Sequence, residues 1–239
     1  MTSSPQVALV TGGSRGIGRA IVEALLARGM KVFFCGRDAR VLEDTKQKLF
    51  IAHPGRVFAR SCDVRRAEEV DALVAWVVDE AGRLDVLVNN AGLGRFAPVD
   101  ELTAEDFREV VETNLFGPFF GIRAAAPVMK KQGGGWILNV ASLAAKNPFA
   151  GGAAYNASKF GLVGMSEAAM LDLRHAGIRV AAICPGSVAT ELRTTMRQES
   201  QDWMLAPEDV AKVVTDLLDF PDRALPSLIE LRPTRPPKK

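Results

Sequence analysis

Short apolar runs alternate with longer helical stretches along the chain, and this alternation limits the fold more than any other feature. The runs are too short for helices and rich in β-branched residues, as expected of strands buried on both faces. Strands are expected at 7–11, 31–35, 56–61, 84–90, 135–142, 178–185 and 227–231, and helices at 17–29, 38–52, 66–81, 104–131, 152–176 and 207–219. Such βαβ units, joined by right-handed crossovers, predict an α/β fold: a doubly wound parallel sheet of about seven strands with helices on both faces.

The composition argues against several classes of function. The chain has 30 basic and 28 acidic residues, and its net charge of +2 provides no basic field for nucleic acid. No apolar run approaches the ~20 residues that span a bilayer, and the N-terminus has neither the charged nor the apolar region of a signal peptide. We expect a cytoplasmic protein without a membrane or nucleic-acid partner. Because no linker, repeat or low-complexity tract interrupts the pattern, we expect one domain over residues 1–239.

The cysteines and histidines give no sign of a metal site. Cys35, Cys62 and Cys184 are odd in number, far apart in the sequence and embedded in apolar segments. We expect them to be reduced core residues and not parts of a disulfide framework. The only histidines are His53 and His175, too few for a zinc site built from His and Cys clusters.

The glycine-rich segment TGGSRGIG (11–18) lies between the first expected strand and the first expected helix. A helix N-terminus exposes N–H groups and a partial positive charge, which favour an anion. Gly12 allows a sharp turn, Gly16 lets a pyrophosphate approach the backbone, and Gly18 lets the helix pack closely on the strand. Glycine also serves many turns only for its backbone freedom, but this position in the first βα unit predicts a dinucleotide site.

The same residues also fit the motif of a different class of enzyme. GGSRG (12–16) fits G-x-S-x-G, the nucleophile elbow of α/β hydrolases, with Ser14 as nucleophile. A hydrolase would need an acid and then a histidine downstream. His53 lies in a polar turn and His175 at a helix end before a strand, so neither follows a late strand, where that partner belongs. A serine hydrolase is therefore a remote alternative.

The end of the second strand indicates which nucleotide is preferred. An acidic residue there accepts bonds from the ribose of NAD, whereas an arginine accommodates the 2′-phosphate of NADP. Here Arg37 follows the strand, Asp38 is expected to cap the next helix, and Arg15 adds a second guanidinium from the glycine turn. Planar guanidinium groups pair bidentately with phosphate oxygens, so NADP(H) is preferred and NAD(H) remains possible.

Tyr155 is the only tyrosine of the chain, and Lys159 follows it by four positions. On a helix, side chains at i and i+4 share one face. A phenol with a pKa near ~10 is a poor base at neutral pH, but a neighbouring ammonium and an oxidised nicotinamide would both lower that pKa. Taken alone, the pair is more often incidental. However, Ser142 ends the preceding strand at the rim of the sheet that also carries the glycine turn, NNAG (89–92) and CPG (184–186).

Together with Asn114 in ETNLFG, these motifs resemble the short-chain dehydrogenase/reductase family between about residues 6 and 192, and the chain is similar to 3-oxoacyl-(acyl-carrier-protein) reductases. The resemblance implies a Rossmann-type domain that transfers hydride between NAD(P)(H) and a carbonyl/alcohol pair. It implies that Tyr155 is the acid/base, that Ser142 holds the substrate oxygen and that Asn114 fixes a water in a proton relay. Lys159 would lower the pKa of the tyrosine and bond the nicotinamide ribose.

The resemblance also assigns cofactor contacts. Asp63, Val64 and Asn90 would contact the adenine and its ribose, and Pro185, Gly186, Val188 and Thr190 would seat the nicotinamide. The motifs and the resemblance together give these cofactor-binding residues: Gly12, Ser14, Arg15, Gly16, Ile17, Gly18, Arg37, Asp63, Val64, Asn90, Ala91, Gly92, Tyr155, Lys159, Pro185, Gly186, Val188 and Thr190.

The substrate is expected to be a small carbonyl or alcohol compound held by the loops above the rim. Their side chains are largely apolar, with a few arginines: Leu93, Arg95, Phe96, Leu143, Phe149, Arg193, Met196, Arg197, Trp203 and Met204. An apolar ketone or a 3-oxoacyl chain suits such a lining better than a sugar. A homodimer or homotetramer through the helices at 104–131 and 152–176 is expected by analogy. A non-catalytic protein that senses NADP(H) is the alternative function, although such a sensor would not need the phenol.

Overall fold

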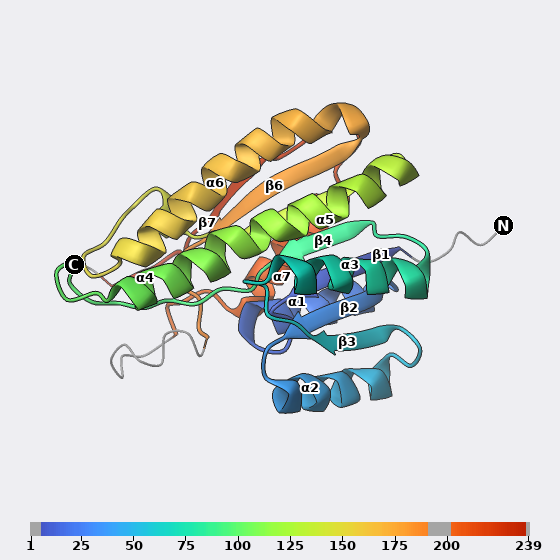
Figure 1. Cartoon of the computed structure of the whole chain (residues 1–239), viewed down its shortest axis with the longest axis horizontal. Coiled ribbons are helices and arrows are strands. Elements are labelled where there is room, and N and C mark those ends of the chain that lie inside the picture. The colour runs from blue at the N-terminus through green and yellow to red at the C-terminus, as the bar shows by residue number, and fades with distance from the viewer. Residues whose placement is uncertain (1–5, 191–201, 238–239) are drawn as a thin grey trace.

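The computed structural model describes residues 6–190 and 202–237, and the strands of this part form one parallel sheet (Figure 1). Its strand order is β3-β2-β1-β4-β5-β6-β7. The strands are β1 (Val7–Thr11), β2 (Lys31–Gly36), β3 (Val57–Ser61), β4 (Val86–Asn89), β5 (Gly135–Val140), β6 (Ile178–Pro185) and β7 (Leu228–Leu231). Every neighbouring pair is parallel, which confirms the predicted doubly wound α/β fold.

Helices cover both faces of this sheet. They are α1 (Gly16–Ala27), α2 (Ala39–Ala52), α3 (Ala67–Ala81), α4 (Ala104–Val111), α5 (Gly117–Gln132), α6 (Ala153–Leu173) and α7 (Pro207–Leu217). Apolar side chains of α1, α2 and α7 form one buried cluster with one face of the sheet, and those of α3, α5 and α6 form a second cluster on the other face. Continuous β-branched and aromatic runs suit strands that are covered on both sides.

The helix at 104–131 forms where the sequence predicts it, but its hydrogen bonding changes in the middle. A π-helical segment, η1 (Glu112–Phe116), joins α4 to α5, and the N–H of Gly117 donates to the carbonyl of Glu112, five residues back. Pro118 follows immediately and has no N–H to offer to the carbonyl four residues before it, which favours such a shift in the bonding pattern. Asn114 lies inside this segment.

The strand order creates a crevice at one edge of the sheet. The chain builds β2 and β3 on one side of β1 and then crosses over, so that β4 lies on the other side of β1. The connections that leave the carboxyl ends of β1 and β4 therefore separate, and ligands of open α/β sheets bind at such a point. Among the described residues, no helix is long and apolar enough to cross a membrane.

Candidate active site

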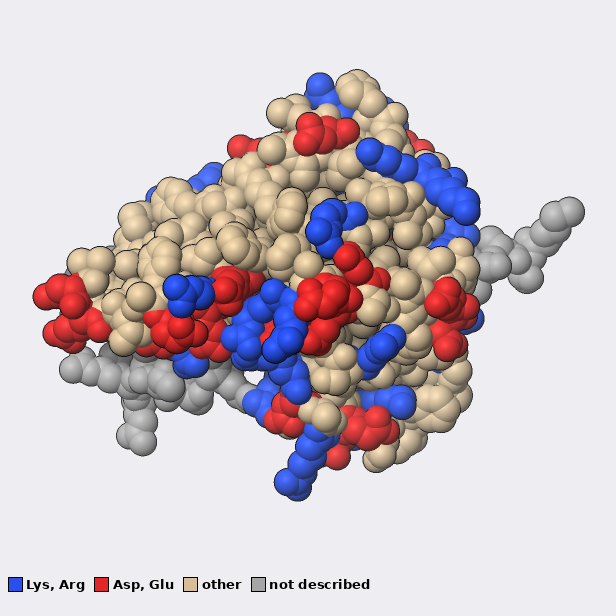
Figure 2. Space-filling model, in the orientation of Figure 1, with Lys and Arg blue, Asp and Glu red and all other residues tan. Residues whose placement is uncertain are grey.

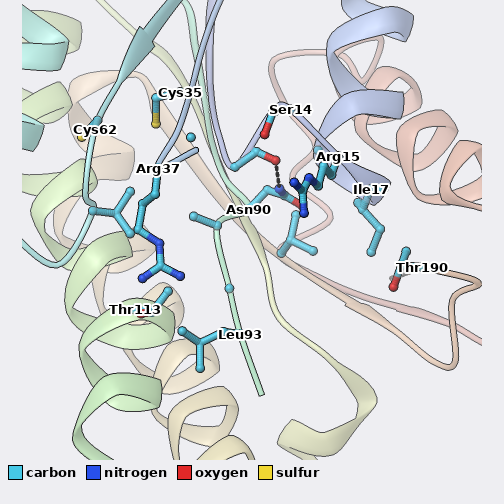
Figure 3. Close-up of a pocket in the computed structure, with 18 of the residues that line it drawn as sticks. Ser14, Arg15, Ile17, Cys35, Arg37, Cys62, Asn90, Leu93, Thr113 and Thr190 are labelled. Carbon is cyan, nitrogen blue, oxygen red and sulfur yellow. Dashed lines mark hydrogen bonds between the residues drawn. The ribbon is translucent and has the colours of Figure 1, made fainter. Parts of the chain in front are cut away.

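A cavity of about 510 Å³ lies at the carboxyl edge of the sheet, where β1 and β4 diverge. Figure 3 shows side chains from the glycine turn, from the ends of β2 and β3 and from the segment after β4 pointing into it. The predicted cofactor residues that line it are Gly12, Ser14, Arg15, Gly16, Ile17, Gly18, Arg37, Asp63, Val64, Asn90, Ala91, Gly92, Tyr155, Lys159 and Thr190. The sequence therefore predicted most of the lining.

The glycine turn at one wall is held by the segment after β4. A side chain at Gly18 would overlap the carbonyl oxygen of Gly12, so the helix can approach the turn this closely only without one. The Asn90 amide donates to the carbonyls of Thr11 and Gly12 at 3.0 and 3.2 Å. The Thr11 hydroxyl in turn accepts from the N–H groups of Asn90 and Ala91. Asn90 lines the cavity, but its amide group fixes the turn.

Two features of the cavity fit an anionic, polar ligand such as a dinucleotide. Helix α1 starts at the turn, its first turn holds no acidic side chain, and its N-cap residue Arg15 makes no side-chain cap bond, so its positive end is available to an anion. Across the cavity, the buried hydroxyl oxygen of Thr113 has no hydrogen-bond partner among the described residues. A buried polar atom of this kind is normally satisfied, so a polar group bound in the cavity would find an acceptor or donor beside it.

Asp38 and Arg15 form one side of the cavity mouth. One carboxylate oxygen of Asp38 accepts the N–H groups of Arg40 and Val41, which confirms the predicted N-cap of α2. The other oxygen accepts from the Arg15 guanidinium at 3.2 Å. Both oxygens of Asp38 are thus engaged, and this geometry does not favour a carboxylate turned inward to a ribose.

A single carboxylate, Glu109 of α4, meets three arginines on the other side of the mouth. Its oxygens lie 3.5 Å from Arg37, 3.4 Å from Arg65 and 2.9 Å from Arg95. Arg37 extends across the cavity toward the helix that carries Thr113 (Figure 3). Figure 2 shows side chains of both signs interleaved in a band beneath α4 and α5. The arginines are 31–51% exposed and Glu109 is 19% exposed, so these partly screened pairs contribute little to stability, although their charges set the field at the mouth.

The ends of β2 and β3 contribute one carboxylate and two thiols to the cavity lining. Arg65 binds Asp63 through two nitrogens and holds the pKa of that carboxyl below its usual range. Cys35 and Cys62 are free and buried, and both line the cavity. The hydrogen bond that the Cys35 thiol donates to Cys62, together with burial, raises the pKa of Cys35 well above its usual range. The thiols are distant in the sequence, but the pairing of β2 with β3 places them together.

Tyr155 and Lys159 lie at the far end of the cavity, on the first turns of α6. The Lys159 ammonium nitrogen lies 5.8 Å from the centre of the Tyr155 ring and donates to the carbonyl of Val140, at the end of β5, at 2.9 Å. Lys159 is buried, and burial lowers its pKa to about 8. No carboxylate of the described residues pairs with Lys159, and an unpaired buried ammonium is costly, so an anion beside it is stabilised.

Asn114 and Ser142 flank this pair but do not line the cavity itself. The Asn114 amide exchanges two hydrogen bonds of 2.9 Å with the backbone of Leu93 and donates to the hydroxyl of Ser158 at 3.1 Å, so it ties the segment after β4 to α6. The Ser142 hydroxyl accepts from the N–H of Ala144 at 3.1 Å, at the start of the short turn η2 (Leu143–Ala145).

The remaining expected cofactor residues, Pro185, Gly186 and Val188, do not line the cavity either. Val188 is buried and bridges to Leu205, and the N–H of Gly186 donates to Leu231 of β7. Their neighbour Thr190 does line the cavity. Of the expected substrate residues, Trp203 and Met204 line a separate cavity of about 730 Å³ beside β7. Arg193, Met196 and Arg197 lie outside the described residues.

Neither histidine joins Ser14 in this cavity. The ring of His53 contacts Arg56 at 3.1 Å, and His175 lies in the turn η3 (Arg174–Ala176) before β6. The geometry required of a serine hydrolase is therefore missing around Ser14. Leu93, expected among the substrate residues, also lines the cavity. Sequence reasoning did not assign seven other lining residues, contributed by strand ends, by the residues just after them and by η1, to this site: Cys35, Gly36, Asp38, Cys62, Thr113, Val140 and Ala141. Some of these residues lie at strand ends on the predicted rim, and that position was the only feature of the sequence that could have located them.

Comparisons with known proteins agree with this architecture. Residues 6–201 match the family model described as short chain dehydrogenase. The chain is 37% identical, over 225 residues, to a 3-oxoacyl-[acyl-carrier-protein] reductase of Synechocystis sp., with 92% of this chain and 91% of that protein covered.

Two solved structures are similar over nearly their whole length. One is actinorhodin polyketide ketoreductase with NADPH, with a TM-score of 0.89 and 34% identity, and 98% of both chains is covered. The other is a metagenomic short-chain oxidoreductase in complex with NADP, with a TM-score of 0.85 and 37% identity over 97% of this chain and 98% of that one.

Proposed function

The chain belongs to the short-chain dehydrogenase family and is an oxidoreductase, and from this premise we propose that it is an NADP(H)-dependent reductase that interconverts a ketone or 3-oxoacyl carbonyl and a secondary alcohol. One observation carries the proposal: Tyr155 and Lys159 lie in the same cavity as the glycine turn. A nucleotide anchored at that turn and a substrate beside the phenol would meet within one cleft.

The residues present fit NADP(H). The start of α1 would hold the pyrophosphate, and Arg37 and Arg15 would bind the 2′-phosphate, while Asp38 is occupied by its cap bonds and by Arg15. Thr113, whose hydroxyl has no partner among the described residues, would lie beside the adenosine half. Two solved relatives that hold NADP or NADPH support this preference over NAD(H). When bound, the nicotinamide supplies or accepts the hydride of the reaction.

Tyr155 is the proposed acid and base. In reduction its hydroxyl would give a proton to the substrate oxygen, and in oxidation the phenolate would take that proton back. Lys159 favours the phenolate, because a buried ammonium without a carboxylate partner gains from an adjacent anion. Ser142 would hold the substrate oxygen: its hydroxyl already accepts from Ala144, which leaves its hydrogen to donate.

Asn114 and Lys159 are placed to share a water at Gly92. A Cβ built on Gly92 would lie 3.2 Å from the Asn114 side-chain oxygen and 3.8 Å from the Lys159 nitrogen, so both polar atoms border the space that this glycine leaves open. A water there would accept from the ammonium and donate to the amide oxygen. We assign to this water the return of a proton to Tyr155 by way of Lys159.

Kinetics with a panel of carbonyls test the proposal. Wild-type protein mixed with NADPH should reduce at least one member of a set of ketones and 3-oxoesters, followed by loss of nicotinamide absorbance. Tyr155→Phe should lower that turnover by about 100-fold or more, with NADPH affinity within about twofold, because general acid catalysis contributes roughly that much. An unchanged rate would show that Tyr155 is not the acid. Tight NADPH binding without reduction of any carbonyl would instead favour the cofactor-sensing alternative.

The helices that carry these residues also supply a surface for a second copy. Phe116, Phe119 and Phe160 expose nearly half of their side chains, and Figure 2 shows mostly uncharged residues over α5 and α6 on the face in view. Apolar surface of this kind marks an interface. We therefore propose a homodimer or homotetramer through α5 and α6. Light scattering in solution should give a multiple of 25.7 kDa, and a monomer at micromolar concentration would contradict this assembly.

A further inference from the structure

Two phenylalanine rings lie against the proposed catalytic tyrosine, just beyond the cavity. The centre of the Phe96 ring lies 5.7 Å from that of Tyr155, the centre of the Phe149 ring lies 6.3 Å from it, and the two phenylalanines are 5.8 Å apart. These distances are typical of contacts between the edge of one ring and the face of another. Phe149 nevertheless leaves 41% of its surface exposed, so this aromatic cluster has a ring free to meet a ligand.

Each phenylalanine ring packs directly against a glycine. A side chain at Gly94 would overlap the Phe96 ring, and a Cβ at Gly152 would lie 2.6 Å from the Phe149 ring. The two supporting segments are joined, because the N–H of Ala97 donates to the carbonyl of Gly151 at 3.0 Å. The rings are therefore held in place before a ligand arrives, which reduces the entropy lost on binding.

The basic residues nearest to these rings in the sequence pair with carboxylates of α4 and β7. Arg95 binds Glu109 and Asp106 on α4, and Lys146 binds Glu230 of β7 at 2.7 Å. Among the described residues, Tyr155 therefore has two aromatic neighbours, Phe96 and Phe149, in addition to the Lys159 ammonium. A ligand group that extends from the reacting carbonyl toward Phe149 would meet the faces and edges of aromatic rings.

We propose that Phe96 and Phe149 are specificity-determining residues that select carbonyl compounds bearing an aromatic ring next to the carbonyl carbon. This inference rests on the proposed function. A planar ring stacks on or tilts against an aromatic face and gains more than its buried area provides, whereas a saturated ring of the same size gains the area alone. The substrate class is therefore an aryl ketone or aryl 3-oxoester.

A matched pair of substrates separates this role from simple packing around Tyr155. Ethyl benzoylacetate and its cyclohexyl analogue carry the same reacting group and a ring of six carbons. For each protein we would measure the ratio of kcat/KM for the aryl ester to that for the cyclohexyl ester, with NADPH. Comparing this ratio between wild type and variant cancels the different intrinsic reactivity of the two esters.

Phe96→Leu and Phe149→Leu keep apolar bulk but remove the ring. Each should lower the ratio roughly three- to tenfold, mainly through KM for the aryl ester, because an aromatic contact is worth about that factor. Turnover of the cyclohexyl ester by the same variants shows that they are folded. Phe220→Leu, an equally exposed ring after α7, should leave the ratio unchanged.

An unchanged ratio in both variants would overturn the inference while the proposed function stands. If that unchanged ratio comes with an equal loss of kcat/KM for both esters, the rings only position Tyr155. Failure of the wild type to reduce either ester, while other ketones of the panel are reduced, would also reject the aryl preference. If no carbonyl at all is reduced, the proposed function fails as well.

Discussion

Each end of the cavity holds a cationic side chain, but the two cations differ in burial and in their partners. At the proposed adenosine end, Arg37 is half exposed and shares one carboxylate, Glu109, with two other arginines. At the proposed catalytic end, Lys159 is only 5% exposed, and its described contacts are a backbone carbonyl and the face of Tyr155. One cation is solvated and balanced by an acid, and the other is buried beside a neutral phenol.

This difference assigns different tasks to the two ends. Exposed ion pairs are screened by water and salt and can exchange partners at little cost, which suits recognition of a charged phosphate. A buried charge interacts strongly with whatever ionises next to it, which suits proton transfer. Substitutions at the catalytic end should therefore have large effects that depend on pH. Those at the adenosine end should have smaller effects that depend on salt.

The largest expected effect concerns the stability of the cofactor-free protein. Burial lowers the pKa of Lys159 to about 8, below its value of about 10.4 in an unfolded chain. Between these pH values the unfolded chain holds a proton that the folded protein has lost, so a rise in pH favours folding. Relative to Lys159→Met, the free energy of unfolding of the wild type should rise by about 3 kcal/mol across this window, measured by urea denaturation.

A matched variant separates this effect from other titrations. Lys48→Met removes an exposed lysine on α2 and should leave the pH dependence of the wild type unchanged. If the wild type and Lys159→Met keep a constant difference in stability from pH 7 to 10, Lys159 is not a destabilised buried cation, and the contrast between the two ends fails.

An intermediate effect is expected at the adenosine end. Arg37→Asp replaces a donor to the 2′-phosphate by a repelling charge and should weaken NADPH binding about 10- to 100-fold, the range for a bond to a charged group. NADH affinity should change much less. Fluorescence titration at low and high salt would measure both constants, and the loss should shrink as salt rises. Arg40→Asp makes the same charge change outside the cavity. Equal losses for both cofactors would refute the role of Arg37.

The smallest effect should come from the carboxylate that competes for Arg37. Glu109→Gln removes this competitor and should tighten NADPH binding about two- to fivefold, the size of a partly exposed ion pair, without a comparable gain for NADH. Glu105→Gln, an exposed residue on the same helix that pairs with Arg108, serves as the control. Weaker NADPH binding in Glu109→Gln would instead show that Glu109 holds Arg37 in place for the phosphate.

Local patterns predicted the fold and much of the site, while contacts between distant segments stayed hidden. The alternation of strands and helices, the glycine turn and the Asp38 cap depend on neighbours within a few residues, and the structure confirms them. The approach of Glu109 to Arg37 depends on how α4 crosses the strand ends, and an ordinary helical glutamate gives no sign of it. The same holds for the paired thiols of Cys35 and Cys62.

The π-helical segment around Asn114 was also missed. Pro118, which follows the segment, is compatible both with the first turn of a new helix and with a kink in a continuous one. The residue pattern alone does not decide between these two structures. The segment matters because it carries the amide that joins the loop after β4 to α6.

Direct titration of Tyr155 tests the central claim, because this chain has one tyrosine and its phenolate absorbance is unobscured by others. Tyr155 and Lys159 titrate as a pair, and the question is which of them releases the first proton once NADP⁺ is bound. If the buried ammonium stabilises the phenolate, the near-ultraviolet absorbance of the phenolate should appear at a lower pH in the wild type than in Lys159→Met. Superimposable curves for the two proteins would contradict the account.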